Sequence, residues 1–272
     1  MKKLTWQVAG VTDCGLVRSE NQDNYYISPD ERVFVVADGM GGVKGGAIAS
    51  RIAVETLKKM YDSKRPDLAD KDAVQDWLQE AVAEANKNIC EESETISGPR
   101  MGTTIVVAVQ PDEGDVLIAH VGDSRAYMLK NGSIEPVTSD HSVVMEMMRK
   151  DKLTPEQCRT NPFRHLLTRC LGHDRDVEID KTQVECDQGN WMVLCSDGLS
   201  SVLSDEEIGS TISDCESAEE VCQMLLAKTL EAGAPDNVTI VTVKYDNEGS
   251  ENTCSDAIGE LNRTSASAAS AE

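Results

Sequence analysis

Basic residues are scarce in this 272-residue chain. Lysine and arginine together number 26, against 48 aspartate and glutamate residues, which gives a formal net charge of −22 at pH 7. Binding to nucleic acid or to an anionic membrane surface requires a net attractive field, so this balance argues against both as general partners. The acidity is compatible with a protein that holds several divalent cations.

Paired cysteines and long apolar runs are also missing. The nine cysteines are scattered, and no two have the Cys-x-x-Cys spacing of a zinc or redox site. Scattered thiols indicate a reducing, cytoplasmic compartment. Residues 1–7 are basic but lack the apolar segment of a secretory signal, and no window approaches the ~18 apolar residues of a membrane-spanning helix. We therefore expect a cytoplasmic protein that is not bound to a membrane.

The remaining composition indicates one domain followed by a tail. Strand-like and amphipathic segments alternate over residues 1–246, which is a usual length for a single domain with a large core. Residues 247–272 lack periodicity and are rich in Ser, Ala, Asn and Glu. This composition predicts a disordered acidic tail.

One apolar run ends on a carboxylate. Residues 33–37 are rich in valine and typical of a strand that is buried on both faces, and Asp38 follows directly, succeeded by Gly39, Met40, Gly41 and Gly42. Aspartate is uncommon in strands and is rarely buried without a partner. Glycine lets a backbone approach a ligand closely. A turn closed by Asp38 is one interpretation, and a cation site is the other.

Further aspartates lie at the ends of other strand-like segments. Residues 24–27 are expected to form a hairpin with residues 33–38, which would bring Asp23 close to Asp38 because hairpin strands are antiparallel. The others lie next to three more apolar runs: Asp123 after 116–121, Asp197 after 191–195 and Asp236 before 238–243.

Carboxylates gathered at one edge of a sheet would repel one another strongly unless cations neutralised them. Because no His or Cys pair accompanies these aspartates, their oxygen ligands favour Mg²⁺ or Mn²⁺ over Zn²⁺. Two such ions can clamp a phosphoryl group and make hydroxide available near neutral pH. The residues thus predict a two-metal hydrolase of phosphate esters.

The other periodic segments complete the expected architecture. Amphipathic helices are predicted to pack side by side, an antiparallel meander to turn at an Asn-Gly pair, and a basic, loop-rich segment to leave the core. These segments are, in order, 45–61 and 73–91 for the first helices, 103–137 for the meander with its turn at Asn131-Gly132, 139–176 for the excursion, and 205–212 and 218–231 for two more helices.

Six motifs in order along the chain give a family resemblance. They are Arg18-Ser19-Glu20-Asn21-Gln22-Asp23, Asp38-Gly39-Met40-Gly41-Gly42, Met101-Gly102-Thr103-Thr104, Gly122-Asp123-Ser124-Arg125, Ser196-Asp197-Gly198 and Asp236-Asn237-Val238-Thr239. Each string alone is common, but six in order within one domain are specific. Over residues 6–245 the chain resembles the type-2C metal-dependent Ser/Thr protein phosphatases, the PPM family, and especially their compact bacterial branch of PrpC and Stp phosphatases.

The resemblance implies an α+β fold, a four-layer αββα sandwich of two antiparallel sheets flanked by helices, with a small flap subdomain at about 139–176 beside the cleft. It also implies two Mn²⁺ or Mg²⁺ ions in the catalytic centre and a third, weaker site. The resemblance also assigns a role to each motif. Asp38 would bridge both ions, and Gly39 would contribute its backbone carbonyl. Asp23 would bind the second ion, Asp197 and Asp236 would bind the first, and Asp123 together with Asp197 would bind the third.

Two further residues would act on the substrate and its surroundings. Arg18 would bind the substrate phosphate, and Asn237 would support metal-bound water or Asp236.

The implied activity is hydrolysis of phosphoserine and phosphothreonine in proteins by a metal-bridged hydroxide, in opposition to a bacterial Ser/Thr kinase. Phosphorylated proteins, such a kinase among them, would be the partners, and we expect a monomer. Two alternatives stay open: a small-molecule phosphomonoesterase on the same centre and a non-catalytic regulatory binding module. Met40 occupies a position where many eukaryotic members have a histidine proposed as general acid, so the resemblance assigns no proton donor for the leaving group.

Overall fold

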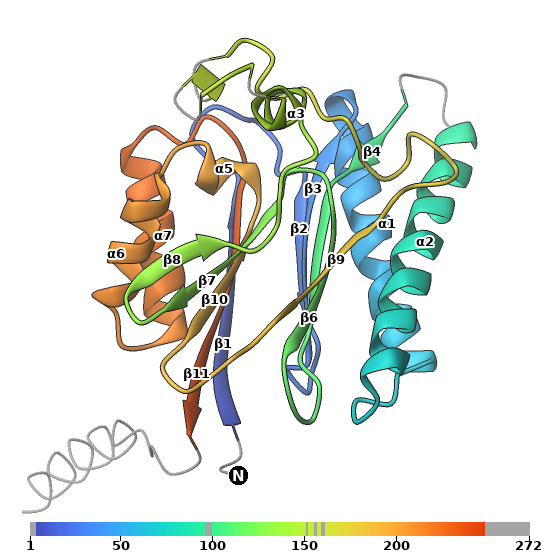
Figure 1. Cartoon of the computed structure of the whole chain (residues 1–272). Helices are drawn as coiled ribbons and strands as arrows, with labels where there is room; N and C mark the ends of the chain where they lie inside the picture. Colours follow the sequence, from blue (N-terminus) through green and yellow to red (C-terminus); the bar gives the residue numbers. More distant parts are fainter. Residues whose placement is uncertain (1–3, 96–99, 151, 155–156, 159–160, 248–272) are drawn as a thin grey trace, which may run out of the picture.

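Two antiparallel sheets face each other, and helices cover both outer faces (Figure 1). The computed structural model describes residues 4–95, 100–150, 152–154, 157–158 and 161–247. The first sheet has the order β1 (Leu4–Asp13), β11 (Val238–Asn247), β10 (Trp191–Cys195), β7 (Arg125–Lys130) and β8 (Ser133–Pro136). The second has the order β2 (Asp23–Ile27), β3 (Val33–Met40), β5 (Ile105–Val109), β6 (Val116–Val121) and β9 (Asp180–Val184), and β4 (Gly102–Thr103) also pairs with β3.

The helices divide between the two sheets. Helices α1 (Gly42–Ser63) and α2 (Lys71–Thr95) lie on the second sheet, and α5 (Asp197–Ser200), α6 (Asp205–Ser213) and α7 (Ala218–Glu231) lie on the first. Helix α3 (Val143–Arg149) lies at the end of the sandwich at which the connection from β1 to β2 also lies (Figure 1). The expected four-layer αββα sandwich is therefore confirmed, as is the side-by-side packing of the two long helices.

Strand β3 is apolar at successive positions because both of its faces are covered. Its side chains alternate between two separate cores because successive residues of a strand point to opposite faces. Val33 and Val35 pack toward α1 and α2, whereas Phe34 and Val36 pack between the two sheets. Both faces of this sheet are covered, so every position from Val33 to Ala37 is buried and apolar.

Two hairpins form as the sequence predicts. Strands β2 and β3 pair antiparallel, and Asp23 is directly opposite Asp38. Between β7 and β8 the backbone adopts positive φ at Asn131 (51°) and at Gly132 (79°), which is the conformation of a type I′ turn.

Strand β9 was not expected from the sequence. Residues 180–183 alternate between partly buried and exposed, only Val184 at its end is buried, and among the described residues the strand pairs with β6 at the edge of the sheet. An edge strand with one solvated face needs no apolar run, so the pattern lacks the signal that identified the central strands.

The 139–176 segment is tied to the core more closely than its polar sequence indicated. Leu171 is completely buried in the core beneath α1 and α2, and its backbone exchanges hydrogen bonds with Thr103. The adjacent Gly172 N–H donates to Asn86 Oδ1 at 2.7 Å. The expectation that the whole segment leaves the core is wrong at this end.

At the carboxyl end of the domain, β11 includes Asn247, and the rest of the predicted tail lies outside the described residues. None of the helices in the described ranges combines the length and apolar character needed to cross a membrane.

Candidate metal centre

The predicted aspartates meet at the end of the sandwich where α3 lies. Asp23 and Asp38 come from paired strands of the second sheet. Asp197 follows β10, and Asp236 precedes β11. Because these two strands pair antiparallel, both residues lie at the same end of the strands of the first sheet. Asp123 lies in the connection between β6 and β7, which passes from one sheet to the other. The sheets thus bring together carboxylates that are up to about two hundred residues apart in the sequence.

Asp23 shows most clearly that a cation would fit among these carboxylates. Its side chain is buried, and its Oδ2 accepts a hydrogen bond from Ser196 Oγ at 2.7 Å, while its Oδ1 is buried without a partner among the described atoms. Burial raises the pKa of Asp23 to about 7, and the charges of Asp197 and Asp236 act in the same direction. A buried carboxylate oxygen that lacks a partner is costly, and a cation would satisfy it.

Asp38 and Asp123 share this electrostatic environment. Burial raises the pKa of Asp38 well above its usual range, and the charges of the other four aspartates, first Asp23 and then Asp197, Asp123 and Asp236, add to the effect. The pKa of Asp123 is raised by burial, then by Asp197 and Asp140. The carboxylates therefore repel one another in the absence of a cation. Because the converging donors are oxygens, they fit Mg²⁺ or Mn²⁺.

The backbone at the end of β3 is held tightly. Asp38 carbonyl oxygen accepts hydrogen bonds from Thr104 N–H and from Thr103 Oγ1, each at 2.8 Å, and Asp38 N–H donates to Thr104 Oγ1 at 3.1 Å. A Cβ atom at Gly39 would lie 2.1 Å from the carbonyl oxygen of Gly46, so only glycine fits there. The Thr103-Thr104 motif thus positions the segment that was expected to bridge two ions.

The loop that carries Asp123 is braced from both sides. Gly122 N–H donates to His141 Nδ1 at 3.1 Å, and His141 N–H donates to the Gly122 carbonyl at 2.9 Å. Ser124 Oγ lies 2.6 Å from Thr104 Oγ1, which links this loop to the end of β3. These contacts hold Asp123 in place through its neighbours in the chain.

His141 forms a second polar cluster with His120 and Asp180 beneath this loop. Their potential metal-binding atoms lie within 4.8 Å of one another, and both histidines are buried. The two imidazole rings stack with centroids 4.6 Å apart and planes 24° apart, so a single ion cannot lie in both ring planes at bonding distance unless one ring turns. Burial and His120 lower the pKa of His141 to about 4, which leaves the ring neutral and able to accept the Gly122 hydrogen bond.

Arg18 lies in the loop between β1 and β2, and Asn237, directly before β11, supports this loop. Arg18 Nη2 lies 2.7 Å from Asp236 Oδ2, and the Arg18 side chain is more than half exposed. Asn237 Nδ2 donates to the carbonyls of Cys14 at 2.9 Å and Glu20 at 3.0 Å, and its Oδ1 accepts from Gln22 N–H at 2.8 Å. The Asn237 side chain therefore supports this loop, whereas its backbone N–H donates to Asp236 Oδ1 at 2.9 Å.

Sequence reasoning missed the residues that position the aspartates. Ser196 was noted only as a neighbour of Asp197, yet its hydroxyl joins Asp23 on the second sheet to Thr239 N–H on β11. Ser142 is the N-cap of α3, and the preceding His141 instead holds the backbone of Gly122. The motifs contained these residues, and only their contacts across the sheets show what they do.

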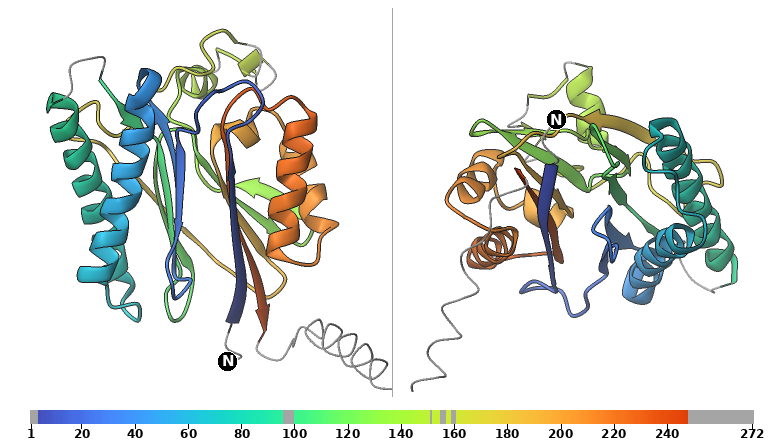
Figure 2. Two further views of the ribbon diagram at one scale, coloured as in Figure 1. Left: turned by 180° about the vertical axis from the view of Figure 1, so that it is seen from behind. Right: turned by 90° about the horizontal axis from the view of Figure 1, so that it is seen from below.

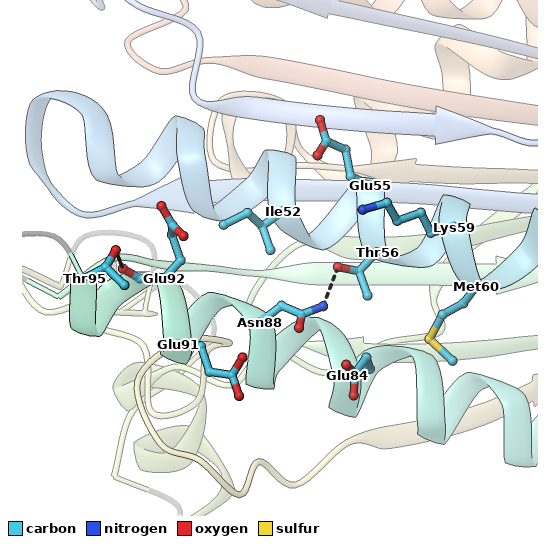
Figure 3. Close-up of a pocket in the computed structure, with 10 residues that line it drawn as sticks. All are labelled: Ile52, Glu55, Thr56, Lys59, Met60, Glu84, Asn88, Glu91, Glu92 and Thr95. Carbon is cyan, nitrogen blue, oxygen red and sulfur yellow. Dashed lines mark hydrogen bonds between the residues drawn. The ribbon is translucent and has the colours of Figure 1, made fainter.

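A separate pocket lies between α1 and α2, away from the aspartates (Figure 3). It has a volume of about 560 Å³, and Asn88 Nδ2 donates across it to Thr56 Oγ1 at 3.1 Å. Half of the lining side chains are charged, among them Glu55, Lys59 and Glu84. None of the predicted site residues reaches it, so it is not the centre that the sequence predicts.

Comparison with known proteins gives one consistent result. The sequence profile of the protein phosphatase 2C family matches residues 17–236. The serine/threonine phosphatase Stp of Listeria monocytogenes is 33% identical over 241 residues, which cover 86% of this chain and 94% of that protein. The crystal structure of the serine/threonine phosphatase PstP/Ppp of Mycobacterium tuberculosis is 32% identical with a TM-score of 0.79, and the match covers 88% of this chain and 98% of that one.

A second structure bears on the metals. The catalytic domain of the serine/threonine phosphatase PstP, solved in complex with two manganese ions, is 30% identical with a TM-score of 0.77. That match covers 89% of this chain and 99% of the other.

Proposed function

Because this chain belongs to the protein phosphatase 2C family and is a serine/threonine protein phosphatase, we propose that the aspartate cluster at the end of the sandwich is its catalytic centre. The observation that carries the proposal is the buried, unpartnered Oδ1 of Asp23 directly opposite Asp38. The donor set consists of oxygens, and a related catalytic domain is described with two manganese ions. Metal-dependent catalysis is common to the family.

Each aspartate has a place in this centre. Asp38 would bridge two divalent ions, Mn²⁺ or Mg²⁺, with the Gly39 carbonyl as a further ligand. Asp23 would hold one of these ions, and Asp197 and Asp236 the other. Asp123, together with Asp197, would hold a third, weaker ion.

When bound, the two ions would supply hydroxide near neutral pH and neutralise charge on the phosphoryl group. The residues around the centre contribute by holding the proposed ligands and Arg18 in place. Ser196 orients the Asp23 carboxylate, Thr103 and Thr104 hold the Asp38 backbone, and Asn237 fixes the loop that carries Arg18.

Arg18 is the proposed phosphate-binding residue. Its ion pair with Asp236 places the guanidinium at the border of the cluster, and more than half of the side chain is exposed. A guanidinium has five N–H donors, so it can keep Asp236 and also donate to a phosphate oxygen. It would neutralise charge that develops on the phosphoryl oxygens during in-line attack.

The substrates are proteins phosphorylated on serine or threonine, and such proteins are the products of Ser/Thr kinases. We therefore propose that the enzyme reverses the action of such a kinase, and that the kinase itself is among its substrates. The net charge of −22 favours a centre that is fully neutralised by cations before an anionic phosphopeptide binds.

Phosphate release from a phosphothreonine peptide tests the proposal, with Mn²⁺ or EDTA present. We expect release with Mn²⁺ only. Asp38→Asn and Asp197→Asn should each lower kcat/KM by at least about 100-fold, the size of effect seen when a group that stabilises the transition state is removed. Asp76→Asn, an exposed aspartate on α2, is the matched control and should retain full activity.

Three outcomes would contradict parts of the proposal. Near-full activity in Asp38→Asn or Asp197→Asn would place the centre elsewhere. Release from a small phosphomonoester but not from the peptide would favour a small-molecule phosphatase on the same centre. Mn²⁺ binding without any release would favour the non-catalytic binding module.

A further inference from the structure

Most of the exposed large apolar side chains lie in two short segments. Among the described residues, those of Leu16 (65% exposed), Val17 (70%), Phe163 (52%) and Leu166 (51%) come from the β1–β2 loop and from the segment after α3. One further example, Met224 (44%), lies on α7. Apolar side chains that gather at one place on a surface commonly mark a binding site.

Both segments border the aspartate cluster. Arg18 follows Val17 directly and pairs with Asp236 at 2.7 Å. His165 lies between the two apolar residues of the other segment, and its Nδ1 is 3.9 Å from Asp197 Oδ2. The β1–β2 loop and the segment after α3 also lie at the same end of the sandwich in Figure 1 and in the left view of Figure 2.

The backbone holds these side chains outward. Leu16 N–H donates to the Ala234 carbonyl at 3.0 Å. The Leu166 carbonyl accepts from Val143 N–H at 2.9 Å, and Leu166 N–H donates to the Phe163 carbonyl at 3.0 Å. A ligand that covers these side chains would therefore not have to order the backbone beneath them, which reduces the entropic cost of binding.

We propose that Leu16, Val17, Phe163 and Leu166 form an apolar rim that binds the side chains flanking the phosphorylated residue of a protein substrate. The inference rests on the proposed function, because a phosphoresidue that enters the aspartate cluster brings its neighbours to the border of the cluster. An extended peptide advances about 3.3 Å per residue, so the nearest neighbours on each side are within reach of the rim.

The chemistry of the rim defines the preferred substrate. Apolar flanking residues would bury apolar surface against the rim and gain binding energy. Acidic flanking residues would bury no apolar surface against the rim and would gain none of this binding energy. The rim therefore selects phosphopeptides with apolar residues on either side of the phosphoserine or phosphothreonine.

Kinetics with matched substrates on the full chain test this preference. Three phosphothreonine peptides of equal length would carry leucine, serine or glutamate on both sides of the phosphothreonine, and p-nitrophenyl phosphate would serve as a reference without flanking residues. We expect kcat/KM to be about tenfold higher for the leucine peptide than for the serine peptide or the glutamate peptide, as is typical of a modest apolar contact in a binding site.

Variants assign the preference to the rim. In Phe163→Ser/Leu166→Ser and in Leu16→Ser/Val17→Ser, the ratio of kcat/KM for the leucine peptide to that for p-nitrophenyl phosphate should fall about tenfold. Met224→Ser is the matched control, since it removes an exposed apolar side chain of helix α7, outside both segments of the rim, and it should keep the wild-type ratio.

The outcomes separate this inference from the function on which it rests. Equal kcat/KM for the leucine and serine peptides, or an unchanged ratio in both double variants, would overturn the rim while leaving the phosphatase intact. A wild-type dimer that becomes monomeric in the double variants would show that a second copy covers these side chains, and would also overturn it. Absence of Mn²⁺-dependent turnover of every substrate would overturn the proposed function and the inference together.

Discussion

Asp23 is the residue at which folding and function conflict most directly. The fold buries its carboxyl group and satisfies one oxygen with Ser196, while the other has no partner among the described atoms. Burial and neighbouring carboxylates raise its pKa to about 7. A divalent ion bound as proposed would resolve this conflict, because it would compensate the charge that the fold alone disfavours.

The first prediction concerns the pH dependence of the metal-free protein. The folded pKa of Asp23 lies above its ordinary value of 3.8, so folding favours the protonated form. Its contribution to stability is therefore complete below pH about 4 and is lost as the pH rises through about 7. Urea unfolding in EDTA should show a lower free energy of unfolding at pH 8 than at pH 5, by a few kcal/mol, since each pKa unit corresponds to about 1.4 kcal/mol.

The control is Asp23→Asn, which resembles the neutral carboxyl group at every pH and should show a weaker decrease. Mn²⁺ should stabilise the wild-type protein more at pH 8 than at pH 5, because the ion binds the ionised carboxylate. The same decrease in Asp23→Asn and in wild type would show that Asp23 is not its source.

At the level of elements, the connection between β6 and β7 shows how contacts with neighbouring segments hold a loop and its carboxylate in place. Gly122 adopts φ 107°, and a Cβ atom there would lie 2.6 Å from Thr104 Cγ2, so the chain turns tightly against the residue that precedes β5. His141 holds both polar backbone groups of this glycine. Asp123 is thereby fixed by a residue of the segment that follows β8.

The second prediction is that His141→Ala destabilises this connection. Loss of the ring leaves the buried Gly122 N–H without an acceptor, and we expect a decrease of about 1–3 kcal/mol in the free energy of unfolding at pH 7. Because the folded pKa of His141 is lowered to about 4, its contribution is complete above pH 6.5 and is lost as the pH falls through 4. The difference between wild type and variant should therefore shrink over that range.

His173→Ala provides the comparison, because His173 belongs to the same long segment but its side chain is mostly exposed. Its effect should remain within about 0.5 kcal/mol. Equal destabilisation by both variants would mean that the Gly122 contacts contribute nothing specific.

At the level of the whole molecule, β11 decides where the domain ends. It lies between β1 and β10 in the first sheet and pairs with β1 along its full length, from Asp13 opposite Val238 to Leu4 opposite Asn247. Tyr245 is completely buried between the two sheets. A domain that ended before these residues would lose both strand pairing and core.

The third prediction follows from this boundary. A chain that ends after Asn247 should match the full chain in melting temperature and in kcat/KM for the phosphothreonine peptide. A chain that ends after Val243 should lose about 3–5 kcal/mol, comparable to removal of a large buried aromatic side chain. Thermal unfolding and peptide assays on the two truncated chains check this, and equal stability of both would move the boundary toward Val243.

The sequence alone determined the features that depend on neighbours in the chain. Alternation and apolar runs located the central strands, Asn131-Gly132 located its turn, and the spacing of aspartates at strand ends identified the candidate metal ligands. The hairpin of β2 and β3 even placed Asp23 against Asp38, because a short connection leaves antiparallel pairing as the natural arrangement.

Only the tertiary structure decided what depends on contacts between distant segments. The strand at Asp180–Val184 lies at an edge and carries no apolar signal, and Leu171 enters the core from a polar segment. Ser196 bonds to Asp23 across 173 positions in the sequence, and Asn237 holds the β1–β2 loop from the other end of the chain. Hydrogen bonds of this kind leave no periodicity in a sequence, because the partners are set by how two sheets pack and not by spacing along the chain.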